Sequence, residues 1–390
     1  MQVTGLVSNA DRAAAVRALG ATATLDRKDR RFADLFSVVP EDAAGVRAWL
    51  AAGEVLCAEY RAQNHGRLAD YVVSHAGETA FPRSFQLLEQ GGALTFYGAS
   101  SGYHFTFVGK PGASTPEAML RQAALRAGEA VLVYYGPRTA ELVDRVGLEM
   151  IEAVRALRGR CVVATTTDGQ REFLQSLGFE DAIAGVVSLE EIGRRSSEFE
   201  WPRTMPRLPD AKTATETFRQ AVRDFQDHTL KPFGAAVGKL LRSPDNPRGA
   251  PDLIMERAGH DALGVSTSLV KPFTGRVVYC EDMAGLRYAF YAPQVWTRQR
   301  KILMPTASIL GTHLTNAYEV TRMNDMIAAG LLDVTPPTVV PWHDLPTAHQ
   351  AMWENKHAGA NYLVNHALPA LGLRSKDALL EAWAATEHTS

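Results

Sequence analysis

Two stretches of the chain resemble one another, and this repeat decides the fold. The first, Asp70–Phe107, reads DYVVSHAGETAFPRSFQLLEQGGALTFYGASSGYHFTF, and the second, Asp252–Phe290, reads DLIMERAGHDALGVSTSLVKPFTGRVVYCEDMAGLRYAF. Each copy is typical of a buried strand, a glycine turn, a helix, a turn, a second buried strand and a loop. The aligned pairs are Asp70 with Asp252, Gly77 with Gly259, Ser84 with Ser266 and, after a one-residue shift, Gly102 with Gly285.

A second repeat precedes each of these stretches. GLVSNADRAAAVRALGA (Gly5–Ala21) resembles VATTTDGQREFLQSLGF (Val163–Phe179), and both contain Leu-Gly near their ends. This pattern indicates a strand, a capped turn, a helix and a glycine C-cap, and a further short strand over 21–25 completes a βαβ unit. Repeats this far apart indicate duplicated domains and exclude a solenoid. The sequence therefore predicts two parallel sheets flanked by helices.

The glycine-rich turn of a dinucleotide-binding unit is missing or altered in both copies. Such a unit opens with a strand and a glycine turn that lets the backbone approach a pyrophosphate. The first strand of this chain has the character of the second strand of such a unit, so we expect the turn to lie upstream of Met1. In the second copy, the strand Ala130–Tyr135 leads into GPRTAELVDRVG, where Glu141 and Asp144 would oppose a bound phosphate. We therefore expect the second copy not to bind a dinucleotide in the usual way.

Length and composition agree with two or three globular domains. The chain has 390 residues, 46% of them hydrophobic and 22% charged. We predict an α/β fold of two duplicated Rossmann-like doubly wound parallel sheets, with a truncated first domain over 1–126, a second over 127–330 and a C-terminal segment over 331–390. Residues from Leu371 onward have the pattern of a helix.

Charge and cysteine content exclude several classes of function. The net charge is −2, so neither a nucleic acid nor a membrane surface is an expected partner. No apolar run reaches the roughly 18–20 residues of a membrane span, and the N-terminus lacks the basic region of a signal peptide. Cys57, Cys161 and Cys280 lie far apart without a CxxC pair. We therefore expect neither a disulfide framework nor a cysteine-rich zinc site. We expect a cytoplasmic location.

The closing stretch AHQAMWENKHAGANYLV (Ala348–Val364) resembles the end of the medium-chain dehydrogenase/reductase family, where a helix, a glycine-bearing loop and a strand complete the substrate domain. The chain resembles more narrowly the branch of crotonyl-CoA carboxylase/reductases and acrylyl-CoA reductases. The motifs that carry this likeness are LVSNADRAAAVRALGA, SHAGETAF, YGASSGYHF and ILGTHLTNAYEVTRMNDMI.

This resemblance implies an activity and its partners. It implies NADPH-dependent reduction of an enoyl-CoA thioester, with acrylyl-CoA as the expected substrate, hydride delivered to Cβ and a proton to Cα, without zinc. NADP(H) is then the cofactor and an acyl-CoA thioester the substrate. It also implies a homodimer, and upstream domains of a fusion enzyme or a separate N-terminal portion as partners.

Four residues near the start of the chain are candidates for binding the adenosine 2′-phosphate of NADP(H). Ser8 and Arg12 follow the first strand, where this fold holds the adenosine ribose, and no acidic residue stands at the strand tip to accept ribose hydroxyls. Arg27 and Lys28 follow the next strand, where the family resemblance implies the same phosphate. The alternatives are that Ser8 is only a helix cap, that Arg12 is solvated, and that Arg27 and Lys28 belong to an exposed charge cluster.

Two loops are candidates for lining the cofactor groove, because ligands of open parallel sheets bind at the carboxyl ends of strands. His75 and Gly77 follow one strand, although His75 could equally be a structural histidine. Gly98, Ser100 and Ser101 follow the next strand and are expected near the nicotinamide ribose, where glycine permits a close approach of the backbone.

His313 and Asn316, in GTHLTN, match the family segment that borders the substrate. The resemblance implies that they orient the thioester or a water molecule; the alternative is a helix start capped by Thr312 beside a half-buried histidine. In the second copy, we expect His260 and the acidic pair Glu281-Asp282 to be structural, because two carboxylates would repel a phosphate.

Three hypotheses about the whole chain follow. The second copy could act as an internal pseudo-subunit that buries the sheet edge of the first, as nucleotide domains of this family pair across subunits. The chain could instead be a non-catalytic dimerisation scaffold. A different doubly wound enzyme such as a methyltransferase is a poorer match, because its first strand would need an acidic glycine loop and Gly136-Pro137-Arg138 does not supply one.

Overall fold

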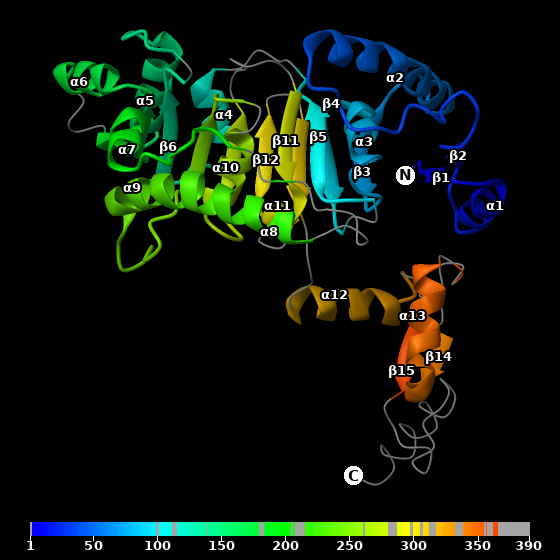
Figure 1. Ribbon diagram of the computed structural model, residues 1–390. Coiled ribbons are helices and arrows are strands. Elements are labelled where there is room, and N and C mark those ends of the chain that lie inside the picture. The colour runs from blue at the N-terminus through cyan, green and yellow to red at the C-terminus, as the bar shows by residue number, and fades with distance from the viewer. Residues whose placement is uncertain are drawn as a thin grey trace. The chain divides into compact units, whose positions relative to one another are not determined.

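The computed structural model divides the chain into two compact units, Met1–His313 and Leu314–Ser390. It describes residues 2–98, 101–110, 115–137, 139–178, 183–203, 206, 215–259, 262–279, 287–296, 299–304, 307–311, 317–331, 338–354, 356 and 362–365. Figure 1 shows the elements with their labels.

One nine-stranded sheet forms the centre of the larger unit. Every neighbouring pair of its strands is parallel except β13 and β12, which are antiparallel. In spatial order the strands are β3 (Ala69–Ser74), β4 (Leu88–Phe96), β13 (Ala307–Gly311), β12 (Lys301–Met304), β10 (Arg276–Tyr279), β9 (Leu253–Glu256), β6 (Ala130–Tyr135), β7 (Arg160–Thr165) and β8 (Ile183–Ser188).

Six of these strands form a complete doubly wound sheet, which we call the second module: β6 to β10 and β12, with their helices. Numbered one to six along the chain, these strands follow the spatial order 3-2-1-4-5-6. This is the strand order of the Rossmann fold. The strands β6 and β9 at its middle are buried along their whole length, as strands covered by helices on both faces must be. The predicted Rossmann-like fold is thus confirmed.

The remaining strands form an incomplete copy, which we call the first module: β1 (Thr4–Val7), β2 (Ala23–Asp26), β3, β4, β5 (His104–Val108) and β13. The strands β1 and β2 pair in parallel in a sheet of their own, and β3, β4 and β13 belong to the nine-stranded sheet. Because β13 follows the whole second module in the chain yet pairs with β4, the second module is inserted into the first. Figure 1 shows the yellow strand β11 beside the cyan β5, with which it pairs.

The helices repeat along with the strands. In chain order they are α1 (Ala10–Ala18), α2 (Ala43–Gln63), α3 (Phe81–Gln86), α4 (Pro116–Gln122), α5 (Arg145–Ala156), α6 (Asp168–Ser176), α7 (Leu189–Arg195), α8 (Thr215–Asp224), the π-helix η2 (Phe225–Leu230), α9 (Lys231–Leu241), α10 (Ala262–Leu269) and α11 (Ala292–Trp296). Asn9 caps α1 and Thr167 caps its equivalent α6, and both helices end at a leucine followed by a glycine of positive φ. Equal lengths and caps at equivalent positions confirm the second repeat.

The two modules meet around an approximate two-fold axis. The strand β5 pairs antiparallel with β11 (Arg287–Tyr291), and the central pair of this register is Thr106 opposite Ala289. These two residues are also equivalent in the sequence repeat, so each module presents the same surface to the other, as in an isologous dimer interface. The antiparallel pair β12 and β13 continues the sheet across the junction. The sheet edges of the two modules are thus joined within one chain.

Aromatic side chains fill the core at this junction. Phe290 of β11 lies 5.7 Å from Phe105 of β5 between ring centroids, and 5.8 Å and 5.9 Å from Phe81 and Phe96. All four rings are almost fully buried. Phe105 and Phe81 come from the first module. Phe290 comes from β11, which lies between β10 and β12 in the chain and so belongs to the second module, and one hydrophobic core therefore serves both. The two modules are therefore expected to unfold together.

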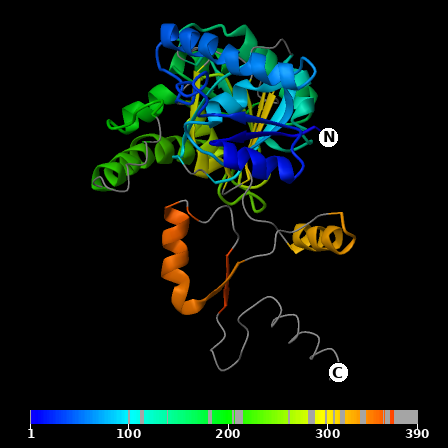
Figure 2. The same ribbon diagram turned by 90° about the vertical axis from the view of Figure 1, so that its right-hand side faces the viewer.

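The start of the first module is held by α2. Leu25 of β2 packs in one cluster with Leu56 and Cys57 of α2, and Gln2 donates a hydrogen bond of 3.2 Å to the backbone oxygen of Gln63. The helix α1, by contrast, has no buried residue. Figure 2 faces this end of the unit and shows α1 with its two strands below the long α2.

The smaller unit contains α12 (Ala317–Ala328), β14 (Thr338–Pro341), the short 3₁₀-helix η3 (Trp342–Asp344), α13 (Leu345–Trp353) and β15 (Tyr362–Asn365). The strands β14 and β15 pair in parallel across α13, which is a βαβ unit. The helix and strands expected from the closing stretch are present, and the helix expected from Leu371 lies outside the described residues. In the part of the chain that the structure describes, no helix has the length and apolar character to cross a membrane.

The two described cysteines are buried thiols. Burial raises the pKa of Cys57 to about 11 and that of Cys161, at the centre of β7, to about 12. Both are free of disulfides. Among the described residues, no group of three or more His, Cys, Asp and Glu side chains is placed to hold a metal ion.

These thiols predict a loss of stability at high pH. An unfolded cysteine ionises near pH 8.5, whereas the folded thiols stay protonated to about pH 11 and 12, so above pH 9 the unfolded chain binds fewer protons. Each group then lowers the free energy of unfolding by at most about 1.4 kcal/mol per pH unit. Urea unfolding at pH 8, 9, 10 and 11 measures this, and Cys161→Val should make the decline shallower. An identical decline in Cys161→Val would contradict the assignment.

Candidate functional site

The carboxyl ends of β1 and β2 bring together the residues predicted to bind a phosphate. Val7 lies opposite Asp26 in the parallel register, and the backbone nitrogen of Arg27 donates to the oxygen of Val7 over 2.9 Å. Ser8 and Arg27 therefore follow neighbouring strand ends, with Lys28 next to them. Arg12 lies in the first turn of α1, which starts from the same edge.

The alternative interpretation of Ser8 as the helix cap is wrong. The side chain of Asn9 caps α1, because its Oδ1 accepts a hydrogen bond of 2.8 Å from the backbone nitrogen of Arg12. The half-buried Ser8 stands one residue before this cap. Its hydroxyl is therefore not used for capping, and its role as a phosphate donor stays a prediction.

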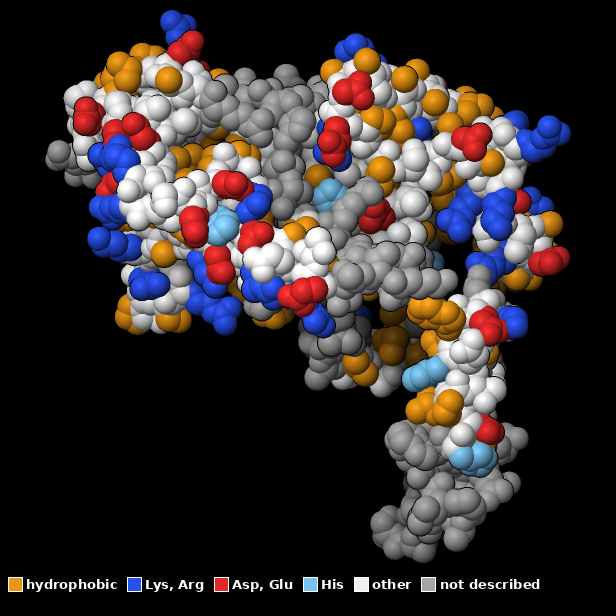
Figure 3. All heavy atoms as spheres, in the orientation of Figure 1, with side chains coloured by type: hydrophobic (Ala, Val, Ile, Leu, Met, Phe, Trp, Pro, Cys, Tyr) orange, Lys and Arg blue, Asp and Glu red, His pale blue; other side chains and the backbone are white. Residues whose placement is uncertain are grey.

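Positive charge gathers at this edge. Figure 3 shows Lys and Arg side chains clustered over α1 and the neighbouring strands. Within the described ranges, no carboxylate forms an ion pair with Arg27 or Lys28; the Asp26 side chain accepts instead from the backbone nitrogen of Lys28 over 2.9 Å. Two cationic side chains without a carboxylate partner can bind a phosphate.

The loops after β3 and β4 interlock at the carboxyl edge of the nine-stranded sheet. The hydroxyl of Ser101 donates to the backbone oxygen of Ala76 over 2.7 Å and accepts from the backbone nitrogen of Thr79 over 3.2 Å. Gly77 has a φ of +87° and lies so close to the second loop that a Cβ would stand 2.8 Å from the nitrogen of Ser101. The structure thus brings Gly77 and Ser101 together and gives Ser101 a role in holding the loop.

His75 and Gly98 belong to the same two loops but are less enclosed than Gly77. The exposed His75 stacks on Tyr97, with ring centroids 5.7 Å apart and an angle of 18° between the planes. Gly98 has a φ of +59° and no atom within 4 Å of a Cβ built on it. The stack leaves an aromatic surface beside His75, and sequence reasoning missed Tyr97 although it directly precedes the predicted glycine loop. Ser100, His313 and Asn316 lie outside the described residues.

In the second module, a carboxylate fills the place of a pyrophosphate. Asp144 caps α5 by accepting from the nitrogen of Gly147 over 3.1 Å, and it also accepts from the nitrogen of Gly136 over 2.7 Å. Its other partner is the guanidinium of Arg257, and both side chains are almost fully buried. A phosphate bound at a helix N-terminus would likewise be a negative group that accepts hydrogen bonds from backbone N–H groups. Sequence reasoning read Asp144 as repelling a phosphate, but here the side chain replaces it.

The side chain of Gln170 fills the rest of that turn. This fully buried amide donates to the backbone oxygens of Thr139 and Glu141 over 3.0 Å and 2.8 Å, and accepts from the nitrogen of Thr166 over 2.9 Å. A Cβ on Gly136 would lie 2.2 Å from its Nε2. The residues of the second module therefore do not fit a dinucleotide.

The repeat shows where the predicted residues of the first module lie relative to the missing turn. Arg12 occupies the position of Gln170, and His75 occupies that of Arg257. Because Gln170 and Arg257 both contact the turn after β6, their equivalents belong to the edge where the first module would hold such a turn. A role of Arg12 and His75 in binding the phosphates of a dinucleotide stays a prediction. Arg257 could have been found from its alignment with His75.

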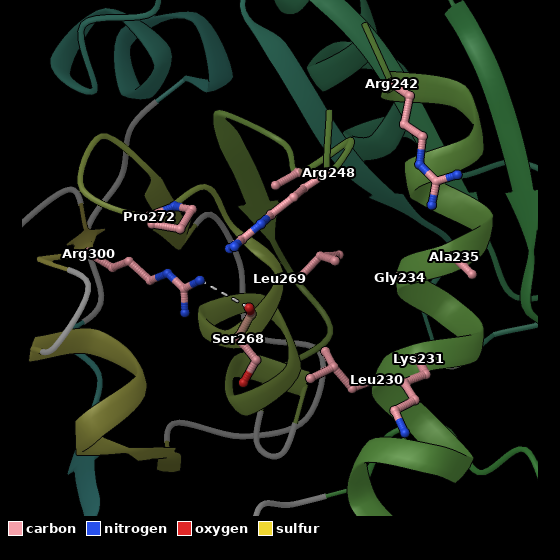
Figure 4. Close-up of a pocket in the computed structure, with 11 residues that line it drawn as sticks. Leu230, Lys231, Gly234, Ala235, Arg242, Arg248, Ser268, Leu269, Pro272 and Arg300 are labelled. Carbon is pink, nitrogen blue, oxygen red and sulfur yellow. Dashed lines mark hydrogen bonds between the residues drawn. The ribbon is translucent and has the colours of Figure 1, made fainter. Parts of the chain in front are cut away.

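A cavity of about 560 Å³ opens in the second module between η2, α9 and the end of α10 (Figure 4). Arg300 donates to the oxygens of Ser268 and Gln294 over 3.1 Å and 3.0 Å and so caps the carboxyl end of α10. The cavity contains none of the predicted site residues. Its lining is Leu230, Lys231, Gly234, Ala235, Arg242, Arg248, Ala250, Ser268, Leu269, Pro272 and Arg300.

The interlocked loops predict different costs for two glycine substitutions. Gly77→Ala would place a methyl group against the backbone of Ser101 in addition to a strained φ, whereas Gly98→Ala meets only the strained φ. We expect about 1 kcal/mol for Gly98→Ala and at least about 2 kcal/mol for Gly77→Ala. Urea unfolding compares the two variants. Equal losses would show that the two loops do not press on one another.

Comparison with known proteins identifies the chain's relatives. No protein-family model matches it. A crotonyl-CoA carboxylase/reductase from Cereibacter sphaeroides is 30% identical over 258 residues, which are 66% of this chain and 51% of that protein. The chain thus spans about half the length of the curated relative that it matches.

Solved structures give a weaker likeness. A crotonyl-CoA carboxylase/reductase shares 22% identity at a TM-score of 0.36, covering 69% of this chain and 54% of that one. The crotonyl-CoA carboxylase/reductase AntE in complex with NADP shares 24% identity at a TM-score of 0.37, covering 64% and 54%. Because both TM-scores lie below 0.5, the fold assignment rests on the strand order described above.

The doubly wound sheet defines the class of the chain as Rossmann-like. In sequence the chain is similar to a crotonyl-CoA carboxylase/reductase, a member of the medium-chain dehydrogenase/reductase superfamily.

Proposed function

We propose that the chain is the reductase part of an enzyme that reduces an enoyl-CoA thioester with NADP(H). The observation that carries this proposal is the 30% identity over 258 residues with a crotonyl-CoA carboxylase/reductase. We propose acrylyl-CoA as the substrate and propionyl-CoA as the product, as in the reductase part of propionyl-CoA synthase. The partners are then further domains of a fusion enzyme or a separate N-terminal portion, and the assembly is a homodimer.

The first module supplies the binding residues. Arg12, Arg27 and Lys28 attract the adenosine 2′-phosphate at the edge of β1 and β2, where the hydroxyl of Ser8 adds a donor. The loops at Gly77 and Gly98, with Ser100 and Ser101, border the nicotinamide ribose, and His75 faces the pyrophosphate. The locked contact between the two loops keeps this border in place without a change on binding.

When bound, the cofactor supplies the hydride that adds to Cβ of the enoyl thioester. His313 and Asn316 hold the thioester or a water molecule by hydrogen bonds, so that a proton reaches Cα from a fixed direction. The second module, whose turn is filled by Asp144 and Gln170, binds no cofactor and acts as a pseudo-subunit that completes the sheet.

A binding stoichiometry and an assay test this proposal. We expect at most one NADPH per chain by calorimetry, weak binding by residues 1–390 alone, and slow oxidation of NADPH with acrylyl-CoA or crotonyl-CoA. Arg27→Ala should weaken NADPH binding by about 10- to 100-fold, because a charge-assisted hydrogen bond contributes about 1.5–3 kcal/mol, while NADH binding changes little.

Two outcomes would reject parts of this function. Two equivalent NADPH sites per chain would contradict the role of the second module. Equal weakening of NADPH and NADH by Arg27→Ala would remove the 2′-phosphate from this edge. If no enoyl-CoA is reduced even when the intact enzyme is assayed, the chain is a dimerisation scaffold.

A further inference from the structure

The cavity between η2, α9 and the end of α10 occupies a place where the first module packs two helices together. The repeat aligns α3 with α10, and α2 precedes β3 as α9 precedes β9. In the first module, the side chain of Gln86 in α3 donates to the backbone oxygen of Leu50 in α2 over 3.1 Å. Arg83 of α3 lies over the ring of Trp49 in α2, with its guanidinium carbon 3.4 Å from the ring centroid. Two long side chains thus bridge the two helices.

The second module has shorter side chains at the same two positions. Val265 of α10 aligns with Arg83. Ser268 aligns with Gln86, and its hydroxyl donates to the backbone oxygen of Gly264 in its own helix over 2.8 Å. A cavity of about 560 Å³ remains beside them. This volume lies within the range of about 300–1,000 Å³ that is typical of small-molecule sites.

The cavity lies at the amino edge of the sheet. The helix α10 begins beyond the carboxyl end of β9 and runs back, so its last residues, Ser268 and Leu269, lie near the start of that strand. The backbone nitrogen of Lys271 accordingly donates over 2.9 Å to the oxygen of Pro251, which precedes β9. Doubly wound sheets bind dinucleotides at the opposite, carboxyl edge. The cavity is therefore separate from the place where this fold holds a cofactor.

The lining of the cavity is positively charged. Among the described residues it includes no Asp or Glu, and its four basic members are Lys231, Arg242, Arg248 and Arg300. Lys231 forms an ion pair with Asp227, so its charge is largely compensated. Within the part of the chain that the structure describes, no carboxylate forms an ion pair with Arg242 or Arg248. Because the net charge of the whole chain is −2, this excess of positive charge is local.

Arg300 adds a positive charge that the fold holds in place. It is 5% exposed, and its hydrogen bonds to Ser268 and Gln294 go to backbone oxygens, which carry no net charge. Figure 4 shows it on the side of the cavity opposite α9. The first module uses Lys110 in the same way, since its Nζ donates to the backbone oxygen of Gln86 over 3.4 Å. A cation thus caps the equivalent helix in both modules, and in the second it also borders the cavity.

The other two arginines belong to the loop 242–252, which joins α9 to β9 and is longer than the connection between α2 and β3. The side chain of Asn246 accepts from the backbone nitrogen of Ala250 over 3.1 Å and donates to its oxygen over 2.8 Å. Gly249 has a φ of +65°, and a Cβ on it would lie 2.5 Å from the oxygen of Gly238 in α9. The loop is therefore fixed on the helix, which lowers the entropy cost of binding a ligand with its side chains.

We propose that this cavity binds a ligand that carries a chain of two or more phosphates. Arg242 and Arg248 would donate charge-assisted hydrogen bonds to the phosphate oxygens, for which the planar guanidinium is suited. The apolar members of the lining offer a surface for the rest of a larger ligand; they include Leu230, Leu269 and Pro272. An inorganic oligophosphate and a nucleotide share this chemistry, and the experiment distinguishes them.

Calorimetry on the full chain at low salt tests the proposal, with ATP and sodium tripolyphosphate as probes. We expect one molecule bound per chain, with a Kd below about 100 μM for the better probe. AMP should bind at least about 10-fold more weakly, because it has a single phosphate. Tighter binding of ATP would assign the site to a nucleotide, and equal or tighter binding of tripolyphosphate would assign it to an inorganic oligophosphate. No binding of either probe at about 1 mM would overturn the proposal.

A matched pair of variants separates the site from a general effect of charge. Arg248→Ala removes an exposed side chain of the lining, and Lys239→Ala removes a positive charge from α9 outside it. Both variants should unfold at the urea midpoint of the parent chain. We expect Arg248→Ala to weaken binding of the better probe by about 10- to 100-fold and Lys239→Ala by less than about 2-fold. Equal weakening by the two variants would overturn the proposal.

Two further variants test the location of the site. Ser268→Gln restores the residue of the first module and should weaken binding by at least about 10-fold without removing a charge, because the longer side chain fills the cavity. Arg27→Ala, at the edge of β1 and β2, should leave binding of the better probe unchanged. Weakening by Arg27→Ala but not by Arg248→Ala would place the phosphates at that edge and overturn the proposal. None of these readouts depends on NADPH or on turnover.

Discussion

Replacing Asp144 by Ala is expected to destabilise the protein by about 3–5 kcal/mol. The carboxylate is the partner of the buried Arg257 and accepts from the backbone nitrogens of Gly136 and Gly147. Its removal deprives the buried guanidinium of its opposite charge and deprives α5 of its N-cap. It also leaves two buried backbone donors without the carboxylate acceptor. Chemical denaturation with urea measures the loss as a shift of the transition midpoint.

Asp144→Asn is the control for shape. An amide oxygen can still cap α5, but it carries no charge for Arg257, so we expect a loss of about 2–3 kcal/mol, between that of Ala and no change. If Asp144→Ala costs less than about 1 kcal/mol, the side chain does not replace a phosphate in this turn. If Asp144→Asn lowers the free energy of unfolding as much as Asp144→Ala does, the stabilisation comes from the charge and not from the cap.

Replacing Phe290 by Ala is expected to cost about 3–5 kcal/mol and to weaken the coupling between the modules. The ring is 1% exposed and lies against Phe81, Phe96 and Phe105 at the junction. Its removal leaves a cavity where the two modules share a core. Unfolding followed by far-ultraviolet circular dichroism should shift to a lower urea midpoint and should broaden, because each module would begin to unfold by itself.

Phe290→Leu tests whether volume or the aromatic contact matters. A leucine fills most of the space, so we expect a loss of about 1–2 kcal/mol and a transition as sharp as in the parent chain. A sharp transition in Phe290→Ala with a loss below about 1 kcal/mol would show that the junction does not depend on this ring. The strand pairings of β12 with β13 and of β5 with β11 would then carry the coupling.

Local patterns sufficed to predict the repeated elements. The buried run Ala130–Tyr135, the glycine after each leucine at the end of a helix, and the aligned glycines Gly77 and Gly259 each depend on residues close in the chain. The carboxyl-edge location of Ser8, Arg27 and His75 followed from the general rule for parallel sheets. Local composition also marked the turn of the second module as unsuited to a phosphate, although not that Asp144 would take its place.

What the sequence determined by itself is the duplication and the order of strands and helices within each copy, because caps, turns and apolar periods are set by neighbouring residues. Only the tertiary structure decided that β13 returns to β4 after the whole second module, that Asp144 turns inward to Arg257, and that the ring of Phe290 packs against Phe105 of the first module. Each of these contacts joins residues more than a hundred positions apart in the chain. Long-range pairing depends on the packing of the whole sheet, which a local pattern does not contain.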